Sequence, residues 1–316
     1  MVSIENKEIN ERRRLYDAAA KRLLSYKEVI ANILKYTVRE FKGCSNSEII
    51  ACLDGNPEIG TVPVDDEFMP GMDVAGSESV SEKEGIRSFD IKFKVKLPTD
   101  EEAELIINLE SQNNYRPGYT LEKRGIYYLS RLISSQYNIE FKNSNFDKLK
   151  KVYSIWICTH APYELANTIT EYRFRPENLT GQMPDIPQNY DLMSLIMINL
   201  GAKDKNYDGL IRMLDILLNL YSEKEERSAS FDILENDYNI SLRSVRKEVE
   251  NMCNLSQGVY DDGMTAGFSK GKIEGKISNA VKVVRNLLAK GFTLEEALVI
   301  ADIDKGTYEK NCSQMQ

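Results

Sequence analysis

The chain has 316 residues, of which 42% are hydrophobic and 28% charged, and this composition excludes the intrinsically disordered class. Its formal net charge of −8 excludes a protein that binds polyanions with its whole surface, so any contact with nucleic acid must come from a local basic patch. Five cysteines without a Cys-x-x-Cys pair, one histidine and no apolar run long enough to cross a membrane predict a cytoplasmic protein with reduced thiols and no zinc site.

Hydrophobic periodicity predicts an α/β order over the first 225 residues. A helix is expected from about residue 15 to 41, followed by a short β-like piece at 58–64 and a long loop. Strands are expected at 86–97, 104–112, 151–159, 167–174 and 190–200. Two further helices are expected at 119–137 and 207–222.

The remaining residues are expected to be helical instead of α/β, with a helical connector at 226–257 and a tail at 258–316. In the tail, four glycines recur every four residues and would form one ridge of a helix: Gly263, Gly267, Gly271 and Gly275. Glycine inside a helix costs about 1 kcal/mol relative to alanine, so the ridge needs close packing against a second helix. An apolar seam continues at Ile273, Ile277, Val281, Val284 and Leu288. We therefore expect a homodimer through the tail, with a flexible glycine-rich linker as the alternative.

The last part of the tail predicts two helices around Gly291, with Thr293 and Glu296 as a capping box. In outline this resembles a helix-turn-helix. Acidic residues Glu295 and Glu296 stand where the second helix would approach phosphates, which favours a structural or dimer role over DNA reading.

The strands at 86–97 and 104–112 alternate with a period of two. Matching their apolar faces across the turn selects one antiparallel register, which places Ile91 opposite Leu109. The next pair is Asp90 and Glu110, so two carboxylates lie about 5 Å apart on one face of the hairpin. Such a pair repels unless something positive lies between the two groups.

A hard divalent cation would relieve this repulsion. Mg²⁺ takes oxygen ligands and often uses one or two carboxylates while it keeps several waters. Gln112, two residues after Glu110, projects beside it toward a metal-bound water or a phosphate oxygen. The cluster fits activation of water against a phosphodiester. The alternative is a solvated strand face on which Lys92 neutralises the acids.

Asp90 and the run Glu110-Ser111-Gln112 resemble the D…(D/E)xK signature of PD-(D/E)XK nucleases, in a Glu-x-Gln form. Longer segments are similar, in order, to the recombination-promoting nuclease and transposase group of that superfamily: FDIKF at 89–93, LIINLESQ at 105–112, YRPGYTLEKRGIYYLSRLISSQY at 115–137 and KKVYSIWICT at 150–159. The likeness covers most of residues 15–255, and the glycine repeat is also typical of the group.

The resemblance implies a restriction-endonuclease-like mixed sheet flanked by helices, and DNA cleavage that depends on Mg²⁺, with Mn²⁺ as a substitute. It assigns Asp90, Glu110 and the carbonyl of Ser111 as metal ligands and places Gln112 where a lysine is usual. Glutamine cannot carry the charge that stabilises the attacking hydroxide or the phosphorane. Glu28 in the first helix resembles the acid that some members add to the metal site.

Basic residues near the acids are candidates for DNA binding. Lys92 and Lys94 share their strand face and could supply the missing charge. Arg124 and Arg131 share one face of the helix at 119–137, which begins near the site, and Arg116 lies in the turn before it. The alternative for this helix is a solvated face on which its arginines pair with acids.

The expected function is hydrolysis of DNA by a nuclease domain at 1–225, in recombination, mobile-element activity or defence. The main alternative is a weakened or inactive nuclease fold that acts as a DNA-binding or partner-binding module. Such a module would hold DNA without Mg²⁺ and never cut it. A transposase that also joins strands is a third possibility and would require a strand-transfer product.

Overall fold

The computed structural model describes residues 2–53, 57–59, 90–98, 100–112, 115, 117–201, 207–218 and 224–312. The chain divides into two compact units, Asn10–Ser256 and Met1–Ile9 with Gln257–Gln316. The division expected from the sequence, near residues 225 and 257, stays a prediction. Within the described ranges, no helix has the length and apolar character needed to cross a bilayer.

A six-stranded mixed sheet lies at the centre of the larger unit, in the order β1-β2-β3-β4-β6-β5. Its strands are β1 (Glu58–Ile59), β2 (Ile91–Leu97), β3 (Asp100–Gln112), β4 (Val152–Cys158), β5 (Thr168–Arg173) and β6 (Met193–Asn199). β3, β4 and β6 are parallel, and the other ladders are antiparallel. The α/β class with a mixed sheet flanked by helices is confirmed.

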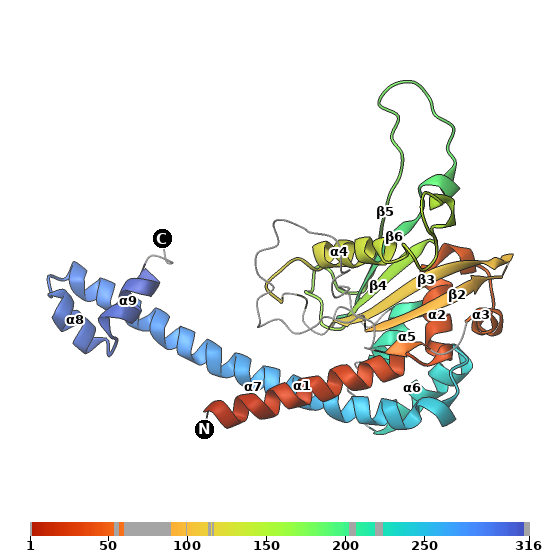
Figure 1. Cartoon of the computed structure of the whole chain (residues 1–316). Coiled ribbons are helices and arrows are strands. Elements are labelled where there is room, and N and C mark those ends of the chain that lie inside the picture. The colour runs from red at the N-terminus through yellow and green to blue at the C-terminus, as the bar shows by residue number, and fades with distance from the viewer. Residues whose placement is uncertain are drawn as a thin grey trace. The chain divides into compact units, whose positions relative to one another are not determined.

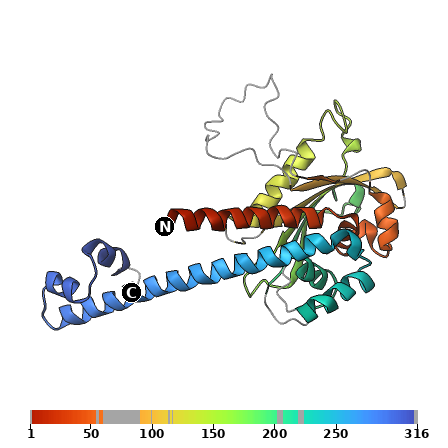
Figure 2. The ribbon, with the colours of Figure 1, turned by 90° about the horizontal axis from the view of Figure 1, so that it is seen from below.

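The α-helices are α1 (Val2–Leu24), α2 (Lys27–Thr37), α3 (Asn46–Cys52), α4 (Leu121–Ser134), α5 (Gly209–Leu218), α6 (Lys224–Asn236), α7 (Leu242–Ala289), α8 (Leu294–Ile300) and α9 (Lys305–Cys312). Three short 3₁₀ helices add η1 (Arg39–Phe41), η2 (Phe146–Lys148) and η3 (Pro187–Asn189). Helices cover both faces of the sheet, with α4 on one face and α2 and α5 on the other (Figures 1 and 2).

The α4 face of the sheet has a closely packed core. Tyr128 and Leu132 of α4 are buried against Trp156 of β4 and Leu195 of β6. A Cβ added at Gly125 would lie 2.6 Å from Cδ1 of Leu195, so α4 approaches β6 more closely than any other residue there would allow. This packing fixes α4 beside the end of β3.

The β2–β3 hairpin has the expected register, because Ile91 lies opposite Leu109 and Phe93 opposite Ile107. Two details differ from the prediction. β3 already begins at Asp100, next to an irregularity at Leu97, so the turn is shorter than the sequence suggested. In addition, β2 begins at Ile91, and Asp90 precedes the strand instead of extending the ladder.

A single helix at 15–41 is a wrong prediction. α1 ends at Leu24, Tyr26 has an extended backbone (φ −66°, ψ 134°), and α2 begins at Lys27. The break redirects the chain, so that Leu24 before it and Ile30 after it are both buried.

The second unit contains the glycine repeat, which lies within the long helix α7, and the two short helices α8 and α9 (Figure 1). The predicted capping box is confirmed, because Thr293 Oγ1 accepts from the amide of Glu296 at 3.3 Å and the Glu296 carboxylate accepts from Thr293 N at 2.9 Å. Val281 and Val284 of the predicted seam are already buried, together with Ala297 of α8.

Candidate active site

Asp90 and Glu110 meet at the end of the β2–β3 hairpin. The amide of Asp90 donates to Oε1 of Glu110 at 3.1 Å, and the amide of Ser111 donates to Oδ2 of Asp90 at 2.9 Å. These two bonds fix the carboxylates against each other, although Asp90 lies outside the regular ladder. The contact inferred from strand alternation is therefore present.

Both carboxylates are largely removed from water. Glu110 is 3% exposed, and burial together with the neighbouring Asp90 raises the pKa of Glu110 well above its usual range, against the opposing effects of the Asp90 amide and Arg124. The pKa of Asp90 is also raised, because burial outweighs the lowering by Lys21 and by the Ser111 amide. Among the described residues, no lysine or arginine nitrogen forms an ion pair with Glu110. The pair is short of positive charge.

Helix α1 supplies a cation that the sequence did not predict for this site. Lys21 Nζ lies 2.8 Å from Oδ1 of Asp90 and 2.8 Å from Oδ2 of Asp17. The i,i+4 spacing of Asp17 and Lys21 suggests a local helix pair. No local pattern indicates that this pair packs against Asp90, which lies far along the chain.

A buried polar path continues from Glu110 into the sheet. The side chain of Asn108 donates hydrogen bonds to Glu110 and, at 3.1 Å, to Oγ of Ser154. Trp156 Nε1 also donates to Ser154 Oγ, at 2.9 Å. Asn108, Ser154 and Trp156 are fully buried, so these bonds fix the base of the site.

Arg124, in the first turns of α4, is held by aromatic side chains. Its guanidinium donates to the hydroxyl of Tyr128 at 2.7 Å and to that of Tyr119 at 2.7 Å. It also lies 5.3 Å from the ring centroid of Trp156, which neighbours Glu110 across the β3–β4 ladder. Sequence analysis placed Arg124 at the site but did not predict that Tyr119 and Tyr128 would hold its guanidinium.

Three other predicted residues lie near the acids or along the adjoining strands. Gln112 ends β3, and its carbonyl accepts from the amide of Thr159 at 3.1 Å. Lys92 lies opposite Asn108 in the ladder. Lys94 lies opposite Ile106, and its Nζ is 2.6 Å from Oε1 of Glu140, so this lysine is committed to another acid.

The remaining predicted residues are farther apart or not described. Arg131 lies two turns beyond Arg124, about 10 Å along α4. Glu28 lies in the first turn of α2 and lines a surface pocket with Pro57 and Ile59. Asp90 forms its hydrogen bonds and its ion pair with α1 and β3, and none of them involves Glu28 within the described residues. Arg116 lies outside the described residues.

The oxygen atoms at the site fit a hard cation such as Mg²⁺. Residues of a strand direct their backbone groups alternately to its two edges, and Gln112 uses its carbonyl toward β4 while Ser111 uses its amide toward Asp90. The Ser111 carbonyl therefore also points to the Asp90 edge. No group of three or more His, Cys, Asp or Glu side chains gathers anywhere in the described ranges, so the donors are two carboxylates and this carbonyl. Mg²⁺ commonly accepts such a partial set and completes it with water and substrate phosphate.

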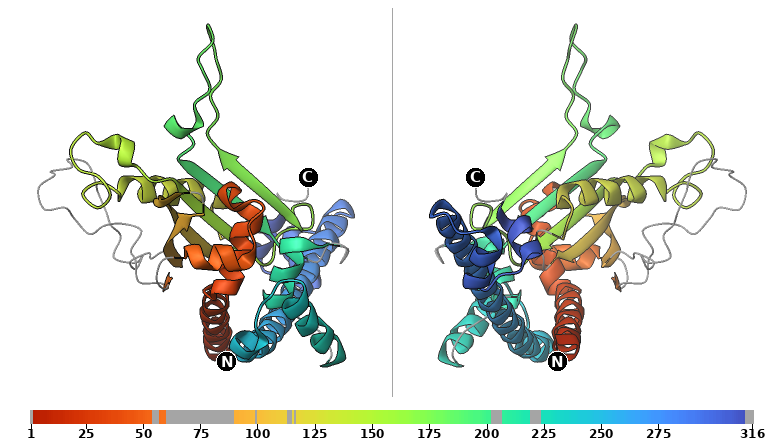
Figure 3. Two further views of the ribbon diagram at one scale, coloured as in Figure 1. Left: turned by 90° about the vertical axis from the view of Figure 1, so that its right-hand side faces the viewer. Right: turned by 90° about the vertical axis from the view of Figure 1, so that its left-hand side faces the viewer.

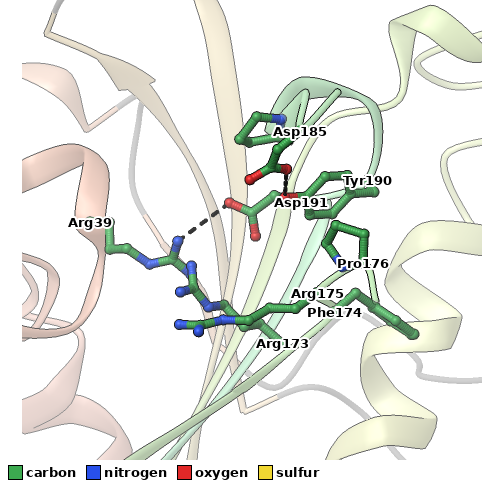
Figure 4. Close-up of a pocket in the computed structure, with 9 residues that line it drawn as sticks. Arg39, Arg173, Phe174, Arg175, Pro176, Asp185, Tyr190 and Asp191 are labelled. Carbon is green, nitrogen blue, oxygen red and sulfur yellow. Dashed lines mark hydrogen bonds and ion pairs between the residues drawn. The ribbon is translucent and has the colours of Figure 1, made fainter. Parts of the chain in front are cut away.

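A second charged region lies at the opposite end of the sheet, where β5 ends and β6 begins. Its pocket has a volume of about 350 Å³. In Figure 4 the guanidinium groups of Arg39, Arg173 and Arg175 gather on one side, and Asp185 and Asp191 lie on the other. The connection between β5 and β6 that carries part of this pocket extends away from the sheet (Figure 3).

Acids at this second region have close basic partners. Arg39 Nη2 lies 2.6 Å from Oε1 of Glu171, and Lys151 Nζ lies 2.7 Å from Asp191 and 3.0 Å from Glu40. Burial would raise the pKa of Glu171, but the hydrogen bonds from Arg39 and Ser194 outweigh it and leave the pKa below its usual range. Charge is therefore balanced within the protein at this end.

No family model matches the chain, and no curated protein and no solved structure matches it either.

Proposed function

We propose that this protein is a Mg²⁺-dependent DNA endonuclease with the restriction-endonuclease-like core of the PD-(D/E)XK superfamily. The observation that carries the proposal is the buried pair of carboxylates, Asp90 and Glu110, tied together by two backbone amides and lacking enough positive charge. Two desolvated acids in contact are costly unless a cation joins them. Their place at the end of β3, next to the start of α4, matches the order of segments that resembles this superfamily.

Asp90, Glu110 and the carbonyl of Ser111 would hold the ion. When bound, Mg²⁺ activates a water molecule and shields the charge of the scissile phosphate. Arg124 keeps part of its guanidinium for a phosphate oxygen, since the tyrosine hydroxyls use only some of its five N–H groups. Gln112 offers an amide at the end of the strand, to orient water or phosphate without adding charge.

DNA is the proposed substrate, and the sequence resemblance alone suggests recombination, mobile-element activity or defence in the cytoplasm as the setting. The tail supports a homodimer as a further part of the proposal. Ile273 is 59% exposed, and a Cβ at Gly271 or Gly275 would meet nothing within 4 Å. This stretch of α7 leaves room for a second helix from a partner copy.

A DNA-binding module without cleavage is the second candidate. It is favoured by Gln112, which carries no charge, and by Lys94, which is occupied by Glu140. Such a protein would keep the fold and Arg124 but would have no lysine on the strand that carries the acids.

Cleavage of supercoiled plasmid in Mg²⁺, Mn²⁺ or EDTA tests the choice, with Asp90→Ala and Glu110→Ala compared with the wild type. We expect metal-dependent nicking that falls at least about 100-fold in both variants. Asp208→Ala removes an exposed acid of the same chain and should cut like the wild type. A folded wild type that binds DNA in EDTA and never cuts it would instead establish the binding module.

A further inference from the structure

The Glu-x-Gln run carries no positive charge, but among the described residues one lysine forms an ion pair with Asp90. The three lysines of β2, Lys92, Lys94 and Lys96, lie opposite Asn108, Ile106 and Glu104, and Lys94 pairs with Glu140. Lys21 comes from a different element and contacts Asp90 directly, at 2.8 Å. No feature of the hairpin sequence suggests it.

Lys21 is held in place by the packing of the helix that carries it. Tyr16, Ala20 and Leu24 of α1 are buried, and the hydroxyl of Tyr16 donates to the carbonyl of Leu218 at 3.2 Å. The side chain of Lys21 is 24% exposed, so its ammonium lies at the margin between the buried acids and solvent. A lysine stem attached to a fixed helix can move its charge by a few Å without any backbone change.

Lys21 keeps its proton, and therefore its positive charge, in this position. Burial alone would lower its pKa, but Asp90 and Asp17 outweigh burial and raise the pKa above the usual value. Asp17 is 43% exposed, whereas Asp90 is 13% exposed. Asp17 can therefore keep its contact with Lys21 at the surface when Asp90 takes another partner.

We propose that Lys21 serves the site in two positions. In the metal-free protein it neutralises Asp90, and when Asp90 acts as a metal ligand, Lys21 stays on Asp17 and supplies positive charge to the phosphate. Lys21 is thus a positioning and charge-supplying residue that replaces, from helix α1, the lysine absent at Gln112. This inference rests on the proposed nuclease function.

A purely structural ion pair is the competing explanation, and the two differ in what removal of the charge does. In either case, Lys21→Met leaves Asp90 buried without its cation, which destabilises the metal-free protein and tightens divalent-ion binding, because a competing positive charge is gone. Only the proposed role also requires that cleavage fall when the ion is saturating.

The experiment compares wild type, Lys21→Met and Lys21→Arg as full-length protein, with folding checked by circular dichroism. Mn²⁺ affinity is measured by calorimetry on the metal-free protein, and plasmid cleavage is measured at saturating Mn²⁺. We expect Lys21→Met to bind Mn²⁺ several-fold more tightly and to cut about 100-fold more slowly, and Lys21→Arg to recover part of the loss. Lys35→Met, which removes an exposed charge from α2, controls for net charge and should match the wild type in both measurements.

Two results would overturn the inference. Cleavage by Lys21→Met within about threefold of the wild type at saturating Mn²⁺ would show that Lys21 only neutralises Asp90. Unchanged Mn²⁺ affinity would show that the lysine and the ion do not share Asp90. A folded wild type that never cuts removes the proposed function itself, and this inference falls with it, which is a distinct outcome from failure of the Lys21 variants alone.

Discussion

The two ends of the same sheet hold their charged side chains in different ways, partly exposed at one end and largely buried at the other. At the start of β6, Glu171, Asp191 and Glu40 each lie within 3.0 Å of a basic nitrogen. At the end of β3, Lys21 pairs with Asp90, Glu110 has no ion pair within the described part of the chain, and the pKa values of both acids are raised. The balanced end has its counter-charges within the chain, whereas the unbalanced end would, under the proposed function, take up an added cation. Charge balance, rather than the presence of a pocket, separates a structural cluster from a candidate site.

The largest expected effect comes from breaking the balanced end. Lys151→Met removes the cation that Asp191 and Glu40 share, while Asp191 keeps Arg39 at 3.5 Å and Glu40 keeps the hydroxyl of Tyr153, so the expected loss is about 2 kcal/mol. Urea denaturation at neutral pH measures this free energy of unfolding. Arg212→Met is the matched control, because its partner Asp208 is 93% exposed and the change should stay below about 1 kcal/mol. Equal losses in the two variants would contradict the comparison.

Removing a negative charge from the unbalanced end should instead raise the free energy of unfolding. Glu110→Gln keeps the shape of the side chain and removes one of two repelling, desolvated charges, so the metal-free protein should gain about 1 kcal/mol. Glu171→Gln, at the balanced end, should lose about the same amount because its ion pair with Arg39 is lost. Thermal and urea unfolding in EDTA measure whether each of the two variants gains or loses stability. A loss of stability in Glu110→Gln would show that this acid is already satisfied within the chain.

The smallest expected effect is a change of stability at acid pH, caused by a third cluster that consists of Glu140, Lys94 and Lys150. Burial would raise the pKa of Glu140, but Lys150 and Lys94 outweigh it and leave the pKa below the usual value. Because the folded-state pKa is lowered, the stability it contributes is present above about pH 4.3 and is lost as the pH falls through the folded-state pKa. Wild type should therefore exceed Glu140→Gln by about 1 kcal/mol near pH 6.

Once the pH has fallen below the lowered folded-state pKa of Glu140, the difference between wild type and Glu140→Gln should vanish. Urea midpoints measured across this range give the answer, with Glu309→Gln, an exposed acid paired with Lys305 at 4.0 Å, as the control. A difference that does not change with pH would mean that the Glu140 ion pairs add nothing to stability.

Local pattern predicted the hairpin because strand alternation and a short turn leave few registers. The contact of Asp90 with Glu110 followed from that register, and the capping box at Thr293 followed from four adjacent residues. Both depend on neighbours in sequence or on one pair of strands.

The features that escaped prediction depend on distant parts of the chain. Lys21 reaches Asp90 because α1 ends at Leu24 and is held by apolar packing. The sequence of the hairpin predicts neither the end of this helix nor its packing. The break at Tyr26 was missed because the apolar period continues across it. Val281 was assigned to a partner copy, but it is buried already in the single chain.

Gly125 links this packing to how the sequence can vary. The residue before it carries the guanidinium held near Glu110, and a single methyl group at position 125 would collide with Leu195 across the core. In a set of related sequences, a larger residue at 125 should therefore appear together with a smaller one at 195. Positions 125 and 195, which have no chemical role, would then covary. Their covariation would indicate that the position of Arg124 is maintained, as conservation of the arginine would.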